Sequence, residues 1–565
     1  MRVERRVPQR LPAALLTICA TTVLAGQQAP QLPATPIQVD RLTAHIKEVS
    51  SDAYEGRGPG TRAEQKVVDY LSKQLMAAGV QPGGDSDGRG GRKWTQGVTL
   101  VKSEANGPIT ASISVAGATI PLKQGDQIAI RSTQLPTPRV SLKNSPIVFL
   151  GYGVNAPERR WDDFKGLDVR GKILVVLIND PDFEADLGRR FDGKAMTYYG
   201  RWTYKFEEAA RHGAAGVLIV HETAPASYGW ATVKNSNTEA VMDIVRDRPA
   251  EVHPPLEAWI QRDVAVDLFK RAGLNFDAEK KKAQSQAFKP VPLGNATLNV
   301  DYAVKQTRLT SSNVVGMVKG TGHPDETVIY SAHWDHLGIG EPDKKGDRIY
   351  NGARDNGTGV ASVLELARVF GRAPRTDRSV AFMFVTAEEQ GLLGSEYYAR
   401  HPLFPLETTV GVFNIDMLGV NGPARDIGVE GDGKLSMQDD LAAAAQKQGR
   451  RFSPDPRPEA GHFYRSDHFP FAKVGVPSIS LKSGEDLYTG GTAVGSKAEE
   501  EFTDQKYHQP GDEWSANWDL RGIALDIGLF YDLGRDLANS RRWPDWKADS
   551  EFKVTRDKTK SARKP

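Results

Sequence analysis

Short apolar runs that alternate with helix-like segments dominate the chain from residue 311 onward. Four of these runs have the length and composition of buried strands, and they cover residues 311–320, 326–333, 379–385 and 410–417. Residues 359–370 carry apolar side chains at helical spacing. Strands that alternate with helices predict an α/β domain with a mostly parallel, mixed sheet flanked by helices. Ligands of such domains gather at the carboxyl ends of the strands.

The first 300 residues have a different pattern. Residues 41–80 carry apolar positions at helical spacing, and the Gly-rich, charged stretch 82–93 marks a boundary. Short alternating runs between residues 94 and 290 predict strands, with one helix-like stretch at 205–216. This pattern predicts a second, β-rich domain inserted ahead of the α/β domain.

The N-terminus has the pattern of a cleavable secretory signal peptide over residues 1–25. A basic start, MRVERRVPQR, precedes the apolar stretch LPAALLTICATTVLA, which is too short to span a bilayer. Small residues predict cleavage near Ala25, so the only cysteine, Cys19, lies inside the signal. A lipoprotein signal ending at Cys19 is the alternative, and bulky Ile18 disfavours it. We expect a secreted or periplasmic protein with no integral membrane span and no disulfide.

The overall charge gives no sign of a nucleic-acid or lipid partner. The chain has 73 Lys and Arg against 71 Asp and Glu, which leaves a formal net charge of +2. The basic end, KVTRDKTKSARKP, is expected to be a frayed tail, because such charge runs are usually solvated. The sequence does not indicate an oligomeric state.

Side chains that can bind metal follow several of the predicted strands. Singly, each has an ordinary explanation: a histidine at a strand end is often a hydrogen-bonded core residue, Asp before Asn-Gly is common in turns, and Glu pairs often start helices. Together they offer imidazole and carboxylate groups, which suit zinc. These side chains are His333, Asp335, Asp355, Glu388, Glu389, Asp416 and His508.

The number of these groups fits a pair of metal ions. Two cations held about 3.5–4 Å apart repel each other less when one carboxylate bridges them. Each ion then needs one histidine and one further carboxylate, so two histidines and three carboxylates suffice. One glutamate of the pair Glu388 and Glu389 is left over. A hydrolase needs such a base to take a proton from water and deliver it to the leaving amine.

Five motifs in order resemble the signature of the M28 family of co-catalytic zinc aminopeptidases. The resemblance runs from Arg41 to about Asn539, apart from an insertion. It implies the zinc peptidase (phosphorylase/hydrolase-like) fold, two zinc ions, and hydrolysis at peptide or protein N-termini. The motifs are His333-Trp334-Asp335, Asp355-Asn356-Gly357, Glu388-Glu389, Asn414-Ile415-Asp416 and His508-Gln509-Pro510.

The resemblance also implies a role for each residue. Asp355 would bridge the two zinc ions. His333 and Asp416 would bind one ion, and Glu389 and His508 the other.

Three further features follow from the same resemblance. Glu388 would be the general base. Asp335 would accept the ring N–H of His333 and fix its tautomer. The family often has a cis peptide after the bridging aspartate, here Asp355-Asn356.

The insertion resembles a protease-associated (PA) domain through VFLGYGV, DDFKGLDVRGKILVV and KFEEAARHGAAGVLIV. The family role of such a domain is a lid or a substrate cleft, and a spacer without substrate contact is the alternative. The predicted organisation is a signal peptide (1–25), the N-terminal part of the peptidase domain (38–93), the inserted PA-containing domain (94–290), the zinc peptidase catalytic domain (291–543) and the basic tail (544–565).

Other residues near the motifs are weaker candidates. Residues 461–479 resemble the family's stretch beside the substrate pocket, in which Tyr464 is a candidate donor to the oxyanion, or else a core aromatic. Arg354 is expected to form a structural ion pair rather than bind a substrate carboxylate. Residues 482–506 are expected to form a long loop beside the pocket. Three other histidines are expected to support the site or lie on the surface: His336, His462 and His468.

Several alternative functions stay open. The same scaffold carries carboxypeptidases and dipeptidases, which recognise a free C-terminal carboxylate. Single-metal glutaminyl cyclases and receptors without catalytic activity are disfavoured, because this chain keeps the full set of ligands. The sequence does not indicate the residue preference or the physiological metal.

Overall fold

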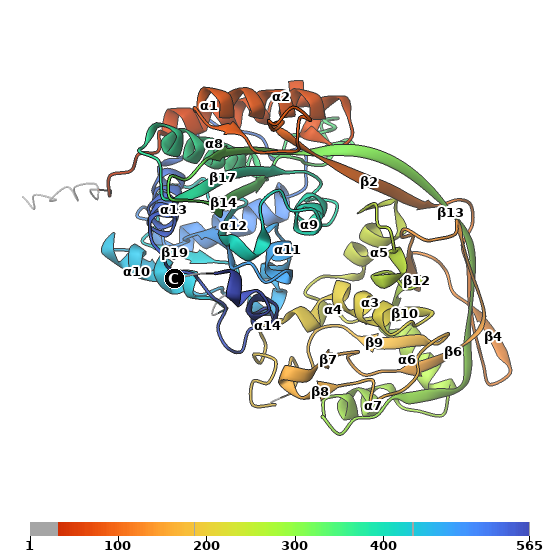
Figure 1. Ribbon diagram of the computed structural model, residues 1–565. Helices are drawn as coiled ribbons and strands as arrows, with labels where there is room; N and C mark the ends of the chain where they lie inside the picture. The colour runs from red at the N-terminus through yellow and green to blue at the C-terminus, as the bar shows by residue number, and fades with distance from the viewer. Residues whose placement is uncertain (1–31, 186, 432–433, 564–565) are drawn as a thin grey trace, which may run out of the picture. The chain divides into compact units, whose positions relative to one another are not determined.

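Two sheets that share one long strand organise the chain (Figure 1). The computed structural model of the protein describes residues 32–185, 187–431 and 434–563. The signal peptide expected over residues 1–25 lies outside these residues. None of the helices in the described part is long and apolar enough to cross a membrane.

The first sheet has four parallel strands at its centre. They lie in the order β17 (Arg378–Val385), β14 (His323–His333), β18 (Thr409–Ile415) and β21 (Ser478–Ser483). Nearly every residue of β17 and β18 is buried, which explains their continuous apolar runs. Antiparallel strands complete the edges, so the mixed, mostly parallel sheet expected from the alternating pattern is confirmed. The edge strands are β13 (Val291–Val318), β2 (Thr95–Ala105) and β11 (Val241–Ile244) on one side, and β19 (Asp426–Val429) with β20 (Arg451–Phe452) on the other.

Helices cover both faces of this sheet. Successive strand residues point to opposite faces, so Val328 and Tyr330 join one apolar cluster and Ile329 joins another. Figure 1 shows α1, α2 and α8 together on the first face. The helices of that face are α1 (Val39–Val49), α2 (Arg62–Ala77), α8 (Gly357–Arg372), α13 (Arg521–Asn539) and α10 (Ser436–Lys447), and α9 (Leu393–Arg400) and α11 (His468–Lys473) pack on the other.

The second sheet has its own apolar core. Its strands lie in the order β4, β3, β13, β6, β9, β10, β12 and β5. Strand β13 pairs with β3 and β6 through its first half and with β2 and β17 through its second half, and Figure 1 shows it as one long curved ribbon. The bounds are β3 (Thr110–Val115), β4 (Ala118–Pro121), β5 (Ile128–Arg131), β6 (Arg139–Phe149), β9 (Ile173–Leu177), β10 (Gly216–His221) and β12 (Leu256–Gln261).

The remaining elements are short strands and the helices of the second sheet. The domain boundaries and the PA identity of this region stay predictions. The elements are α3 (Trp202–Arg211), α4 (Thr223–Ala226), α5 (Trp230–Thr238), α6 (Arg262–Arg271), α7 (Phe276–Ala283), β1 (Gln81–Pro82), β7 (Asn155–Ala156), β8 (Trp161–Asp162), β15 (Gly338–Ile339) and β16 (Ile349–Tyr350).

Two segments differ from the sequence-based expectation. The long loop expected over residues 482–506 is mostly helix α12 (Gly491–Gln505), whose Ala, Glu and Lys content favours a helix. The expected frayed tail instead carries the short helix α14 (Lys553–Asp557). Phe552 and Arg556 are buried, so apolar contacts offset the mutual repulsion of the charges in this segment.

Candidate metal centre

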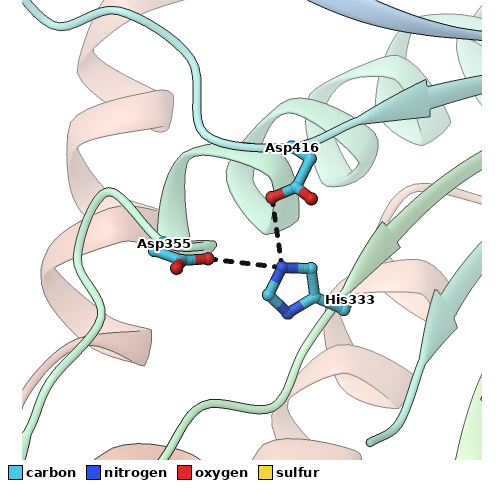
Figure 2. A group of neighbouring side chains, drawn as sticks. All are labelled: His333, Asp355 and Asp416. Atoms are coloured by element: carbon cyan, nitrogen blue, oxygen red, sulfur yellow. Dashed lines mark hydrogen bonds and ion pairs between the residues drawn. The ribbon is translucent and has the colours of Figure 1, made fainter. Parts of the chain in front are cut away.

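The metal-binding candidates meet at the carboxyl ends of β14, β17 and β18. His333 is the last residue of β14, and Asp416 directly follows β18. Nε2 of His333 lies 3.1 Å from Oδ1 of Asp416 and 3.4 Å from Oδ1 of Asp355. Figure 2 shows this imidazole between the two carboxylates. These three residues form the first half of the candidate site.

The second half forms on the other oxygen of Asp355. Nε2 of His508 lies 3.3 Å from Oδ2 of Asp355 and 2.9 Å from Oε2 of Glu389. Glu389 lies shortly after β17, and His508 lies in the turn that follows α12. One carboxylate therefore faces a histidine with each of its oxygens, which is the arrangement that a bridging ligand requires.

The turn before α8 holds Asp355 in place. The Asp355-Asn356 peptide bond is cis, as the family resemblance implied. Oδ1 of Asn356 accepts the N–H of Gly359 in the first turn of the helix (2.9 Å). The amide group of Asn356 donates to the carbonyl of Ile415 (3.0 Å), which ties this turn to the end of β18, next to Asp416.

Glu388 lies beside both halves without forming an ion pair in either. A carboxylate oxygen of Glu388 and ligand atoms of His333 and Glu389 lie within 4.8 Å of one another. Glu388 also lines an open cavity. Burial raises its pKa well above the ordinary value, and the neighbouring carboxylates Asp416 and Glu389 raise it further. A carboxyl group with a raised pKa at the edge of a cavity is suited to proton transfer.

Asp335 supports the site in a different way from the one expected. Nδ1 of His333 lies 3.2 Å from the main-chain oxygen of Asp335 but 3.8 Å from its carboxylate. The carboxylate instead accepts the main-chain N–H of Glu388 (3.1 Å). The chain turns after His333, so the carbonyl is the nearer acceptor and the side chain positions the glutamate pair.

Three further residues support the site: His336, for which a supporting or surface position was expected, and Asp512 and Arg57, which the sequence analysis did not identify. Nδ1 of buried His336 lies 2.6 Å from Oε1 of Glu389. Asp512 accepts main-chain N–H groups of the segment that carries Asp355, and its place four residues after His508 was the available signal. Arg57 is fully buried and donates to carbonyls around the site, but nothing in its sequence context distinguishes it.

The charges of the site call for bound cations. Burial would lower the pKa of His508, but Glu389 and Asp355 raise it to about 10. Burial also opposes ionisation of Asp355, yet His333 and His508 hold its pKa well below the ordinary value. Nε2 of His508 is buried and forms no hydrogen bond of good geometry. Imidazole nitrogen and carboxylate oxygen facing one another are the donors that zinc takes, so the residues fit divalent metal.

The weaker candidates have defined contacts. The hydroxyl group of buried Tyr464 donates to Glu551 (2.7 Å), so its oxyanion role stays a prediction. Arg354 forms the expected structural ion pair, with Glu499 on α12 (2.5 Å). His468 is buried, and burial lowers its pKa to about 3. His462 lies 3.6 Å from Asp455 and 3.7 Å from Glu430.

Comparisons with known proteins support the family resemblance. Residues 313–527 match the model of peptidase family M28. Aminopeptidase YwaD of Bacillus subtilis is 32% identical over 212 residues, 36% of this chain and 40% of that protein. The probable lipoprotein aminopeptidase LpqL of Mycobacterium tuberculosis is 29% identical over 262 residues, 41% of this chain and 49% of that protein. The chain thus spans at most about half the length of these two relatives.

Among solved structures, the chain was matched to the aminopeptidase from Aneurinibacillus sp. strain AM-1. It has a TM-score of 0.47 and 21% identity, and the alignment covers 89% of this chain and 95% of that one. The family model and the two curated relatives thus agree with the resemblance of residues 313–527 to peptidase family M28.

Proposed function

We propose that the protein is an exported, co-catalytic di-zinc aminopeptidase that hydrolyses N-terminal peptide bonds. The observation that carries this proposal is Asp355, whose two oxygens face His333 and His508 separately. Asp416 and Glu389 complete one donor set each. The family match and the aminopeptidase names of the relatives support the reaction.

The residues would divide the chemistry as follows. Zinc ions held by these residues would polarise the scissile carbonyl and lower the pKa of the attacking water molecule. Glu388 takes a proton from this water as the water oxygen forms a bond to the carbonyl carbon. Glu388 then gives the proton to the amine nitrogen as the carbon–nitrogen bond breaks, and it returns to the carboxylate form.

Export is part of the proposal. The N-terminal pattern of a basic start and a short apolar stretch supports it, as does the name of the mycobacterial lipoprotein relative. Mass spectrometry of the protein recovered outside the cytoplasm would test this step. We expect a mature N-terminus near Gly26, and a chain recovered only from the cytoplasm with Met1 intact would contradict export.

The reaction can be tested with one short peptide in three forms: free at both ends, acetylated at the N-terminus, and amidated at the C-terminus. Each form is incubated with and without chelator. We expect amino acids to be released from the free and amidated forms only, and the chelator to stop the release. Loss of release on amidation alone would instead assign the enzyme to the carboxypeptidase branch.

A further inference from the structure

An open cavity of about 770 Å³ adjoins the candidate metal centre. Its lining includes Glu388 and His508 of the metal centre. It also includes side chains around the start of helix α3, which packs against β10 of the second sheet. A cavity of this size can hold a ligand of a few residues, since small-molecule sites are usually about 300–1,000 Å³. Groups on the cavity wall can therefore contact a peptide whose first bond lies at Glu388.

Most cations on this wall are paired with carboxylates. Arg246 pairs with Asp243 and Glu396, and Lys473 pairs with Glu207. Such pairs leave little positive charge to attract an anionic ligand.

Arg201, just before α3, is different. Within the described residues, its guanidinium group forms no hydrogen bond and no ion pair, and its Nε atom is buried without a partner. Burial, as the larger cause, and the positive charge of Arg465 together lower its pKa to about 10. A half-buried guanidinium group whose Nε atom is buried without a partner is costly, so a site that retains one is prepared for an anion.

Arg465 adds a second uncompensated charge to the same cavity. It lies between the short helical turn His462–Tyr464 and α11, and it donates to the carbonyl of Ala460 (2.8 Å) and to Ser227 (3.2 Å). It is exposed and, among the described residues, has no carboxylate in ion-pair range. Two like charges in one partly desolvated cavity repel each other, and an anion between them removes that repulsion.

We propose that Arg201 and Arg465 form a subsite for a carboxylate of the substrate. The planar fork of a guanidinium group matches a carboxylate in two parallel hydrogen bonds. The carboxylate can be the C-terminus of a short peptide or the side chain of an acidic residue. This inference rests on the proposed peptidase function and adds a preference for short or acidic peptides.

The test compares kcat/KM for three peptides that share a neutral N-terminal residue. One has a free C-terminus, one is amidated, and one is amidated but carries Glu in place of a neutral residue. We expect the wild-type protein to favour an anionic peptide over the neutral amide by about tenfold or more. Preference for the free acid alone identifies the C-terminus as the ligand, and preference for the Glu peptide alone identifies the side chain.

Variants connect the preference to the two arginines. In Arg201→Gln and Arg465→Gln we expect the ratio of anionic to neutral kcat/KM to fall towards one, through a higher KM for the anionic peptide. Arg248→Gln is the matched control, because Arg248 is exposed and lies outside the cavity lining, and it should keep the wild-type ratio. An unchanged ratio in Arg201→Gln, or equal rates for all peptides in the wild type, would overturn the subsite.

Failure of the proposed peptidase function can be distinguished from failure of the arginine subsite. If no peptide releases amino acids, the peptidase assignment fails. Calorimetric binding of the same three peptides to Glu388→Gln then measures the preference without turnover. Tighter binding of an anionic peptide, lost on adding Arg201→Gln, supports the subsite, and equal binding of all three rejects it.

Discussion

Asp512 provides a sharp test of how the fold holds the metal centre. Its Oδ1 accepts the N–H of Arg354 (3.0 Å), and its Oδ2 accepts the N–H of Asp355 (3.0 Å). Its own carbonyl accepts the N–H of Ala353 (2.9 Å). The side chain is buried and lies four residues after His508, so it connects the segments that carry two proposed ligands.

Asp512→Ala should therefore weaken both the fold and metal binding. Two buried N–H groups would lose their acceptor, at about 1–3 kcal/mol each, or about 2–6 kcal/mol in total. Loss of a residue that orients a ligand typically lowers metal affinity about 10–100-fold, which equals about 1.4–2.7 kcal/mol. Asp512→Asn keeps one acceptor oxygen and should have an intermediate effect.

The assay is a zinc titration of the metal-free protein against a competing chelator, alongside Tm measured in chelator. Asp504→Ala is the matched control, because Asp504 is an exposed carboxylate on α12 and should leave both quantities unchanged. If Asp512→Ala lowered Tm in chelator but bound zinc as tightly as the wild type, Asp512 would support the fold without positioning Asp355, and the reasoning would be refuted.

Three further predictions concern other residues of the protein. Glu388→Gln should keep its zinc content and lose about 10²–10⁴-fold in kcat, and normal turnover on one unblocked peptide would contradict its role in proton transfer. Burial would lower the pKa of His253, but Glu257 and Asp243 raise it from 6.5 to about 9. Its stabilising contribution is therefore complete below pH 6.5 and lost as pH rises through 9, so His253→Gln should flatten the fall of Tm across this range. Gly359→Ala would place a Cβ atom against the side chain of Asn356. We expect a lower Tm and a loss of about 1–3 kcal/mol in the free energy of unfolding. An unchanged Tm would argue against tight packing at this position.

The parallel part of the fold could be predicted because each buried strand is a continuous apolar run. β17 and β18 end next to polar residues that have no role in a core, and this placed the candidate site at one edge of the sheet. The extent of β13 could not be predicted. The pattern of buried and exposed residues in β13 changes along the strand as it passes from one sheet to the other. A single hydrophobic period therefore does not describe the whole strand.

The residues that support the candidate site were harder to predict than those proposed to bind metal. Asp512 and Arg57 act mainly on main-chain groups of distant segments, and a sequence does not show which carbonyl or N–H group will lie nearby. Asp335 was predicted to accept the ring N–H of His333 with its carboxylate, but the turn of the chain directs this carboxylate to the N–H of Glu388. Local motifs thus indicate which residues matter, while tertiary contacts decide how each one acts.

The most direct test of the central claim is the rate of hydrolysis of one unblocked peptide as zinc is added stepwise to the metal-free protein. We expect no hydrolysis without metal and a rate that rises until two zinc ions are bound per chain. Full activity in the metal-free protein, or none with two zinc ions bound, would contradict the di-zinc aminopeptidase.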